Sequence, residues 1–521
     1  MDWSPKCVDP AQIGLALTLS SWKNNCSGPR TLVCHDLAGN YHEDRFVDGC
    51  YSENPYRFIH WAYVDIFVYF GHDFVIIPPV GWITSAHRNG VPILGTFITE
   101  FDPGKDLCQK LFCRMDQAII IADQLAKIAQ TYGFDGWLIN IENEIEMSMM
   151  NYLTVFLEHL TQKCRSLIGP SSQVIWYDSV TVDGELKWQD ELNEKNKSFF
   201  DLCNGIFLNY AWNEEKLLRS KEVAFAAVRS LDVYVGVDIF GRGVLGGGGF
   251  NCKEALSVIR QLELSVALFA PGWTYQTLPK SDFKVNQQRF WLLLDAFLVC
   301  KPISKLPMII DFCDGLTAKE AEGQGYCFDS RECSSLAVKS FFNLSHQSQQ
   351  PHYLCNSIDS TLCDRMLFEQ PDSSDLSSQG CCLQLTCRKP LEEFRLFCLN
   401  IDLRNFSRRK VNLTFHKSTA SVICALKLMV TANPGDLGPD KTFVFLTDSA
   451  ISLNDQNPEN LVQGCSVSNL DGFESWSWKF PRVPSDDKEF TVTSLDLLIQ
   501  NDSYSDSCNK TLLRLKSLTL E

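Results

Sequence analysis

Eight short apolar runs, rich in Val, Ile, Phe and Tyr, recur through the first 270 residues of the 521-residue chain, and segments with helical periodicity lie between most of them. The runs are Thr31–His35, Asp65–Phe70, Val91–Thr99, Gly136–Glu142, Gln173–Asp178, Gly205–Tyr210, Val233–Phe240 and Leu264–Phe269, and the clearest helical segments are Asp116–Thr131, Tyr152–Leu167, Glu214–Arg229 and Cys252–Gln261. Alternating strands and helices indicate parallel βα units. Eight units within about 250 residues match the size of an α/β protein with a (β/α)₈ TIM barrel. A doubly wound open sheet is the alternative, but eight nearly continuous units favour closure.

The pattern changes near Lys301, beyond which strand-like runs follow one another without helices. The runs are Phe394–Leu403, Val422–Thr431, Thr442–Thr447, Phe490–Ile499 and Leu512–Leu520. This spacing is typical of an antiparallel β-sandwich. We therefore predict a barrel over residues 1–300, an irregular linker over 301–380 that includes the Ser/Asp/Gln-rich stretch 370–380, and a β-sandwich accessory domain over 381–521.

The charge balance limits the classes of partner. Lys and Arg number 47 and Asp and Glu number 63, which gives a net charge of −16. No basic cluster offsets this excess, so the composition argues against nucleic acid and anionic membranes as partners. No run approaches the roughly 18 apolar residues that a membrane span requires.

Cysteine usage and the N-terminal sequence bear on the compartment. The 22 Cys include no CxxC pair, so their spacing predicts no metal site, and we expect no cofactor. Seven N-x-S/T sequons are consistent with secretion. However, the short apolar run Ile13–Leu19 follows Asp2 and Asp9 and has neither a basic flank nor a small-residue cleavage site. We therefore expect a soluble protein of the cytosol rather than a secreted one.

The most informative local sequence is Gly133–Glu142, GFDGWLINIE, at the end of the fourth predicted strand. Residues two apart on a strand share a face, so Asn140 and Glu142 project the same way, together with Leu138. Barrel enzymes keep their active sites at the C-terminal ends of the strands. A carboxylate with apolar walls has its charged form disfavoured, which suits a general acid.

Three interpretations of this pair remain open. In the purely structural one, Glu142 starts a loop and Asn140 caps a turn. In the second, Glu142 works with another carboxylate, Asp178 or Asp238, as in ordinary glycosidases. In the third, the amide replaces the second carboxylate because the substrate supplies its own nucleophile. The 2-acetamido oxygen of an N-acetylglucosamine residue can attack the anomeric carbon, and Asn140 would then hold the acetamide N–H.

Stretches in order from about residue 30 to residue 295 resemble the endo-β-N-acetylglucosaminidases of glycoside hydrolase family 85. They are Phe67–Phe70, Ile77–Trp82, Ala86–Val91, Leu94–Glu100, Phe134–Glu142, Trp176–Ser179, Leu186–Asn193, Tyr234–Asp238 and Ser265–Trp273. The resemblance implies cleavage between the two GlcNAc residues of the N-glycan core, with retention of configuration, substrate assistance and no metal. By the motif, Glu142 would be the acid/base, Asn140 would orient the acetamide and Tyr177 would hydrogen-bond it.

The same resemblance implies substrates and cleft residues. N-linked glycans, free oligosaccharides or glycopeptides would be substrates, and some family members also transfer the released glycan. Trp188 and Trp212 would line the sugar cleft. From their place after the eighth predicted strand, Trp273 and Tyr275 are weaker candidates for the same role. Core packing is the alternative for each of these four aromatic residues.

Two other functions remain as alternatives. A lectin-like barrel would bind glycans without cutting them, although a lectin need not keep both Asn140 and Glu142. A chitinase-type endohydrolase carries DGxDxDxE, whose two internal Asp residues are Leu138 and Asn140 here. His72 and His87 flank a Pro-Pro segment, and we expect structural hydrogen bonds from both. Family members usually carry more sequence before the first strand, which leaves a truncated or alternatively spliced form open.

Overall fold

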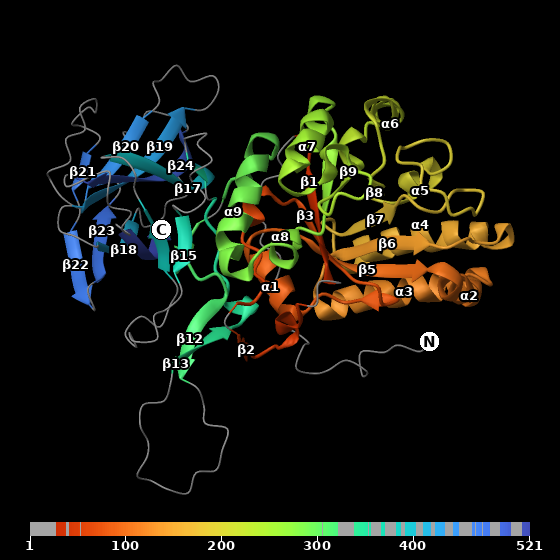
Figure 1. Cartoon of the computed structure of the whole chain (residues 1–521), viewed down its shortest axis with the longest axis horizontal. Helices are drawn as coiled ribbons and strands as arrows, with labels where there is room; N and C mark the ends of the chain where they lie inside the picture. The colour runs from red at the N-terminus through yellow and green to blue at the C-terminus, as the bar shows by residue number, and fades with distance from the viewer. Residues whose placement is uncertain are drawn as a thin grey trace, which may run out of the picture. The chain divides into compact units, whose positions relative to one another are not determined.

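The computed structural model (Figure 1) forms two compact units. The first comprises the described residues up to Val47 together with Tyr63–Val299, and the second comprises Asp48–Ala62 and the described residues from Cys300 to Glu521. The structure describes residues 28–37, 41–52, 54–304, 306–320, 338–352, 354–355, 366–369, 382–386, 391–402, 410–417, 422–432, 441–446, 461–463, 465–470, 473–479, 490–501 and 513–521.

Eight parallel strands form a closed barrel in the first unit. They are β1 (Thr31–Asp36), β3 (Ile66–Phe70), β5 (Ile93–Glu100), β6 (Gly136–Glu142), β7 (Gln173–Tyr177), β8 (Gly205–Leu208), β9 (Val233–Asp238) and β10 (Ser265–Phe269). The pairing of β3 with β5 closes the ring, and the two-residue strand β4 (Val75–Ile76) lies antiparallel to β5. Each of the eight predicted runs overlaps one of these strands, so the predicted TIM barrel is confirmed.

Helices follow the strands around the barrel (Figure 1). They are α1 (Val80–Arg88), α2 (Phe101–Leu111), α3 (Met115–Tyr132), α4 (Met150–Leu167), α5 (Lys197–Leu202), α6 (Glu214–Ala226), α7 (Cys252–Gln261), α8 (Trp273–Gln276) and α9 (Phe283–Leu294). The four predicted helices are α3, α4, α6 and α7. Helix α6 ends before the predicted Arg229, where Val228 has a φ of 57°, outside the helical region. Among the described helices, none is long and apolar enough to cross a membrane.

The alternation of faces along β6 places the polar pair in the barrel interior. Trp137 points outward, and its indole N–H donates to the carbonyl of Leu125 in α3 over 3.1 Å. Leu138 packs inside the barrel with residues of the other strands. Gly136 starts β6 with a φ of 142°, and a Cβ there would lie 1.9 Å from the carbonyl oxygen of Gln173, so the close approach to β7 requires glycine.

The second unit contains two larger sheets that share one hydrophobic core, which is the predicted β-sandwich. The first sheet has β11 (Met308–Ile310), β15 (Met366–Glu369), β16 (Cys382–Leu385), β18 (Lys410–Lys417), β22 (Cys465–Leu470), β23 (Phe473–Lys479) and β25 (Leu513–Leu520). The second has β14 (Leu354–Cys355), β17 (Leu391–Asp402), β19 (Val422–Ala432), β20 (Lys441–Leu446), β21 (Leu461–Gln463) and β24 (Phe490–Asn501). Leu413 and Leu515 from the first sheet and Phe397 and Leu497 from the second belong to the common core.

The units differ from the expected boundaries in two places. Asp48–Ala62 belongs to the second unit, because β2 (Cys50–Tyr51) pairs with β13 (Val338–Phe342), and β13 in turn pairs with β12 (Leu316–Glu320). Residues 301–380 are also more than a linker, since they supply β11, β12 and β13. The Ser/Asp/Gln-rich stretch 370–380 lies outside the described residues.

Candidate active site

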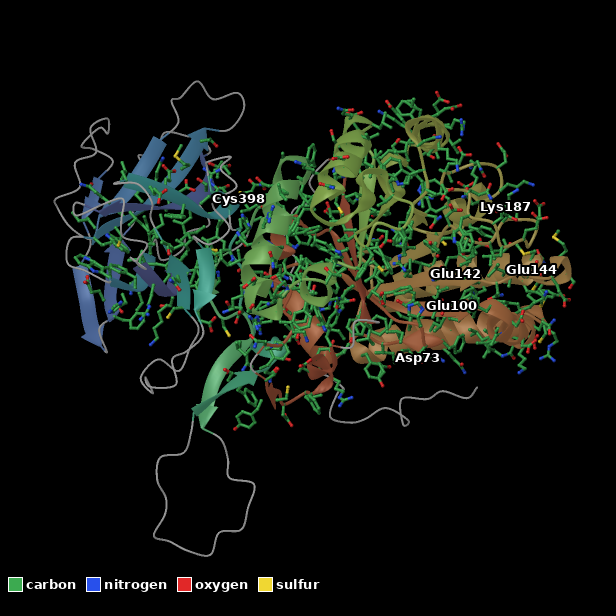
Figure 2. The ribbon with its side chains drawn as sticks, viewed as in Figure 1. Asp73, Glu100, Glu142, Glu144, Lys187 and Cys398 are labelled. Atoms are coloured by element: carbon green, nitrogen blue, oxygen red, sulfur yellow. The ribbon has the colours of Figure 1, made fainter. Side chains whose placement is uncertain are left out.

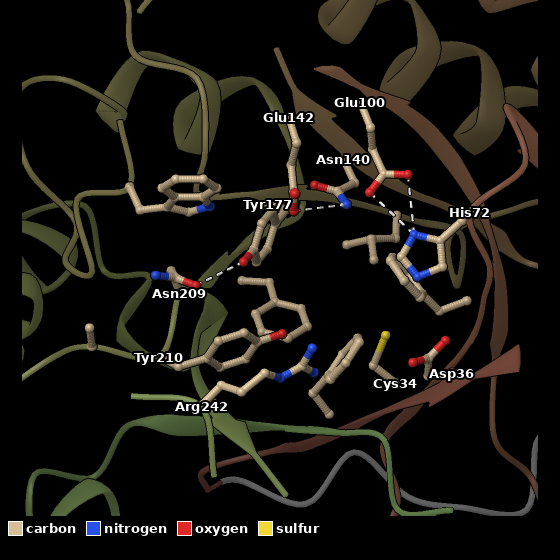
Figure 3. A pocket seen from close by; sticks show the side chains of 16 residues that line it. Cys34, Asp36, His72, Glu100, Asn140, Glu142, Tyr177, Asn209, Tyr210 and Arg242 are labelled. Carbon is tan, nitrogen blue, oxygen red and sulfur yellow. Dashed lines mark hydrogen bonds and ion pairs between the residues drawn. The ribbon is translucent and has the colours of Figure 1, made fainter. Parts of the chain in front are cut away.

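A cavity of about 390 Å³ opens where the barrel strands end (Figure 3). Its lining comes from the C-terminal ends of the strands and from the loops that follow them. The lining residues are Cys34, Asp36, Phe70, His72, Glu100, Leu138, Asn140, Glu142, Tyr177, Trp188, Phe207, Asn209, Tyr210, Ala211, Arg242 and Phe269. Barrel enzymes bind their substrates at this end, and the volume lies in the range of small-molecule sites.

Asn140 and Glu142 project together into this cavity (Figure 3). The Asn140 side-chain amide donates to Oε1 of Glu142 over 3.3 Å. The Oδ1 atom of Asn140 is buried and has no hydrogen-bond partner among the described residues. Because an unpaired buried acceptor is costly, this oxygen is suited to an N–H group of a ligand in the cavity.

The surroundings of Glu142 favour its protonated form. Burial raises the pKa of the Glu142 carboxyl above its usual value. The hydrogen bond from Asn140 opposes this shift, and the nearby charge of Glu100 adds to it. A carboxylic acid that keeps its proton toward neutral pH can donate it to a leaving group.

Glu100 is a second carboxylate in the cavity. It ends β5 and is the register partner of Glu142, so the two lie on neighbouring strands (Figure 2). His72 forms an ion pair with Glu100, with 3.1 Å between Nδ1 and Oε2, and His87 bonds to buried Asp135 over 2.7 Å. The structural hydrogen bonds expected for both histidines are therefore confirmed.

The two carboxylates considered as partners for Glu142 do not line the cavity. Asp178 is buried, and burial raises its pKa to about 7. Asp238 is also buried and accepts from the guanidinium of Arg242 over 2.7 Å. Both carboxylates accept hydrogen bonds from loop residues instead of facing the cavity. Neither can therefore act with Glu142 as the second carboxylate of an ordinary glycosidase.

Tyr177 reaches the cavity from the end of β7, next to the Asn140–Glu142 pair (Figure 3). Its hydroxyl donates to Oδ1 of Asn209 over 2.9 Å. The Asn209 amide donates to Asp190 over 2.7 Å, and Asp190 is ion-paired with Lys216. Burial raises the pKa of the Tyr177 phenol well above its usual value, so the hydroxyl stays protonated. This chain of bonds fixes the phenol position.

Trp188 lines the cavity from the loop after β7 and is 41% exposed. Asp178 holds this loop, because it accepts from the backbone N–H groups of Gln189 at 3.1 Å and Asp190 at 2.7 Å and from the Asn196 amide at 2.9 Å. An exposed indole on a fixed loop offers an apolar face to a ligand.

The other three predicted cleft aromatics lie outside the cavity lining. Trp212 is a core residue instead, since only 6% is exposed and its indole N–H donates to the carbonyl of Gly236 over 2.8 Å. Trp273 packs edge-on against Phe250. Tyr275 is buried and packs edge-on against Phe283. None of these three residues therefore lines this cavity, although each follows a strand end, and their role in binding sugar stays a prediction.

Sequence reasoning missed several lining residues, among them Glu100, Asn209, Tyr210 and Arg242. Glu100 directly follows the predicted strand Val91–Thr99, and Asn209 lies one residue before the end of the predicted strand Gly205–Tyr210. This position near a strand end is the signal that would have indicated them. Arg242 lies four residues beyond β9 in a glycine-rich loop, and nothing in its local sequence indicates the cavity.

Comparisons with known proteins identify relatives of the chain. The chain is 45% identical over 357 residues to "Cytosolic endo-beta-N-acetylglucosaminidase" of Gallus gallus, covering 68% of this chain and 45% of that protein. It is 47% identical over 351 residues to the mouse protein of the same name, covering 67% of this chain and 46% of that protein. The chain thus spans about half the length of these curated relatives.

The fold also matches a solved structure. The glycoside hydrolase domain of Endo-D from Streptococcus pneumoniae R6 aligns with a TM-score of 0.72 at 17% identity, covering all of this chain and 81% of that one. The sequence model described as glycosyl hydrolase family 85 matches residues 40–324, which is more than half of the chain. The chain therefore belongs to glycosyl hydrolase family 85.

Proposed function

We propose that the chain is an endo-β-N-acetylglucosaminidase that hydrolyses the β-1,4 bond between the two GlcNAc residues of the N-glycan core. The observation that carries this proposal is the pairing of Glu142 with Asn140 in one cavity, with the buried Oδ1 of Asn140 unpaired among the described residues. Family membership and the printed names of the relatives support it.

In the proposed mechanism the substrate supplies the nucleophile. Asn140 Oδ1 accepts the acetamide N–H and so aims the acetamide oxygen at the anomeric carbon. That oxygen attacks as Glu142 gives its proton to the leaving glycosidic oxygen, which yields an oxazoline-type intermediate and a free reducing-end fragment. Glu142 then takes a proton from water, which opens the intermediate from the other face and so retains configuration. No second carboxylate is needed.

Tyr177 and Trp188 are proposed to position the substrate. The Tyr177 hydroxyl donates to Asn209 in this structure. When a sugar enters, only the O–H bond would rotate, from Asn209 toward the acetamide, while the ring keeps its position. Replacing Trp188 with Ala removes the apolar wall, and we expect KM to rise about fivefold with little change in kcat, since stacking contributes about 1 kcal/mol. Steady-state kinetics on a glycopeptide test this. The neighbouring exposed Lys187 (Figure 2) gives the matched control, Lys187→Ala, which should leave KM unchanged.

The mass of the products tests the function directly. Incubation with a high-mannose glycopeptide should leave a single GlcNAc on the peptide and release a glycan that ends in the other GlcNAc. Binding without any cleavage would instead indicate a lectin-like barrel. Cleavage of GlcNAc polymers with the glycopeptide untouched would indicate a chitinase-type enzyme.

Glu100 is predicted to tune Glu142 rather than to react. Glu100→Gln removes a negative charge that raises the pKa of Glu142, so that pKa should fall. Because a general acid works protonated, activity is present below this pKa and is lost as pH rises through it. The alkaline limb of the kcat profile should therefore move to lower pH.

The size of the rate change separates this role from a nucleophilic one. We expect kcat at the optimum to change by less than about tenfold, well short of the roughly 10²–10⁴-fold contribution of a proton-transferring group. If Glu100→Gln abolishes turnover as completely as loss of Glu142 does, the two-carboxylate mechanism applies and substrate assistance is wrong.

The proposed substrates are N-linked glycans, as glycopeptides or as free oligosaccharides, and the proposed compartment is the cytosol. The relatives are named as cytosolic proteins. Buried cysteines of the barrel unit such as Cys34, Cys108 and Cys164 are free thiols, which fits a reducing compartment. The intact mass of protein taken from its own cells is the check, because N-glycans on its sequons would contradict this location.

A further inference from the structure

Two thiols and an imidazole meet in the second unit. The potential ligand atoms of Cys300, His352 and Cys398 all lie within 4.8 Å of one another. Cys300 Sγ lies 3.2 Å from His352 Nδ1. The three residues stand 52 and 46 positions apart along the chain, so only the fold brings them together.

Backbone hydrogen bonds hold the three segments in place. Cys398 (Figure 2) lies in β17, and its carbonyl accepts from the N–H of Ile303 over 3.0 Å, which fixes the segment after Cys300. The N–H of His352 donates to the carbonyl of Leu396 over 2.9 Å. Backbone hydrogen bonds to strand β17 therefore hold the cluster in place.

The spacing of the donors fits a tetrahedral metal ion. Zinc binds thiolate sulfur at about 2.3 Å and imidazole nitrogen at about 2.0–2.1 Å, so tetrahedral geometry places sulfur and nitrogen ligands about 3.6 Å apart and two sulfurs about 3.8 Å apart. The 3.2 Å between Cys300 Sγ and His352 Nδ1 and the 4.8 Å limit on the whole group require only small adjustments. His352 is buried and both cysteines are half-buried.

A bound cation would replace one backbone hydrogen bond at the cluster. Metal binds the thiolate form of cysteine, so both thiols would lose their protons on binding. The N–H of Cys398 donates to His352 Nδ1 over 2.6 Å. An ion on Nδ1 would take this lone pair, so binding would release that N–H.

We propose that Cys300, His352 and Cys398 form a binding site for a thiophilic divalent cation of the zinc type. Three protein ligands leave one position for water. The ion ties the start of the second unit to β17. The site is separate from the barrel cavity and takes no part in the proposed hydrolysis.

Cobalt titration of the full chain tests the site. The reduced, metal-free protein should bind one Co²⁺ more than the Cys398→Ser variant, with the strong visible absorption of tetrahedral cobalt and a thiolate charge-transfer band. Zn²⁺ should abolish both signals. Cys300→Ser should weaken this binding by more than about 100-fold, since even partners of metal ligands contribute roughly 10–100-fold. Cys113→Ser, which changes an exposed cysteine of the barrel unit, is the matched control and should behave as the wild type.

A second measurement does not depend on variants. X-ray absorption of the zinc-loaded wild-type protein should show a shell with two sulfur ligands, and a shell of oxygen and nitrogen alone would overturn the proposal. Equal cobalt uptake and spectra in wild type and Cys398→Ser would also overturn it. So would a Cys300–Cys398 disulfide in protein isolated with its thiols blocked, because a disulfide leaves no thiolate ligand.

Discussion

Replacing Glu142 with Gln is expected to lower kcat on a high-mannose glycopeptide by at least about 10³-fold. The amide keeps the shape of the side chain but carries no proton that it can give to the leaving oxygen, and it cannot activate water. The glycopeptide should still bind, because the cavity walls are unchanged. Turnover by mass spectrometry and binding by calorimetry provide the two measurements.

Glu144 offers a matched control for this variant. It follows Glu142 by two residues, but its side chain is exposed and is ion-paired with Lys105 over 2.9 Å (Figure 2). Glu144→Gln should therefore leave kcat within about twofold, since exposed ion pairs contribute little. Near-normal turnover by Glu142→Gln, with a circular dichroism spectrum that matches the wild type, would remove Glu142 from the mechanism.

Replacing Asn140 with Ala is expected to lower kcat by about 10²–10³-fold, the usual effect of removing one polar group that acts in the transition state. The acetamide then loses the acceptor that aims its oxygen, and Glu142 loses its hydrogen bond from the Asn140 amide. Because that bond opposes the rise of the Glu142 pKa, the alkaline limb of the pH profile should move to higher pH. This shift is opposite to that expected for Glu100→Gln.

Substrates with fluorinated acetamides test whether the acetamide oxygen attacks the anomeric carbon or only helps to position the substrate. If the acetamide oxygen is the nucleophile, wild-type kcat should fall stepwise as fluorine withdraws electrons from it. Rates that do not depend on fluorine content would show that the acetamide does not attack. Asn140→Ala would then report only on binding.

The sequence predicted the barrel well because the physical signal is local. Each run of Val, Ile and Phe is long enough for one strand, and the intervening 3.6-residue periodicity shows one buried helix face. The polar pair in β6 was also readable, because Asn140 and Glu142 interrupt an apolar strand at a spacing of two. The face on which they lie follows directly from that spacing.

Other features depend on contacts between residues that lie far apart in the sequence. Trp188 and Trp212 both follow a strand, yet the hydrogen bond of Trp212 with Gly236 turns its ring into the core. No local sequence signal separates the two cases. Strands β18 and β23 were not predicted, although they pair with each other and β18 also pairs with β25. The cluster of Cys300, His352 and Cys398 lacks any motif spacing and exists only after folding.

The segment Asp48–Ala62 interrupts the barrel unit between β1 and β3 and is built into the other unit. There the indole of Trp61 donates to Gln347 over 2.7 Å, and Arg57 is ion-paired with Asp314 in a buried site. A ribosome must therefore synthesise 286 residues beyond Trp61 before its partner Gln347 exists. A cut near Cys300 separates Trp61 from Gln347 and Arg57 from Asp314. A cut at a single peptide bond therefore cannot divide the chain into these two units, because Asp48–Ala62 lies within the sequence of the first unit and belongs to the second.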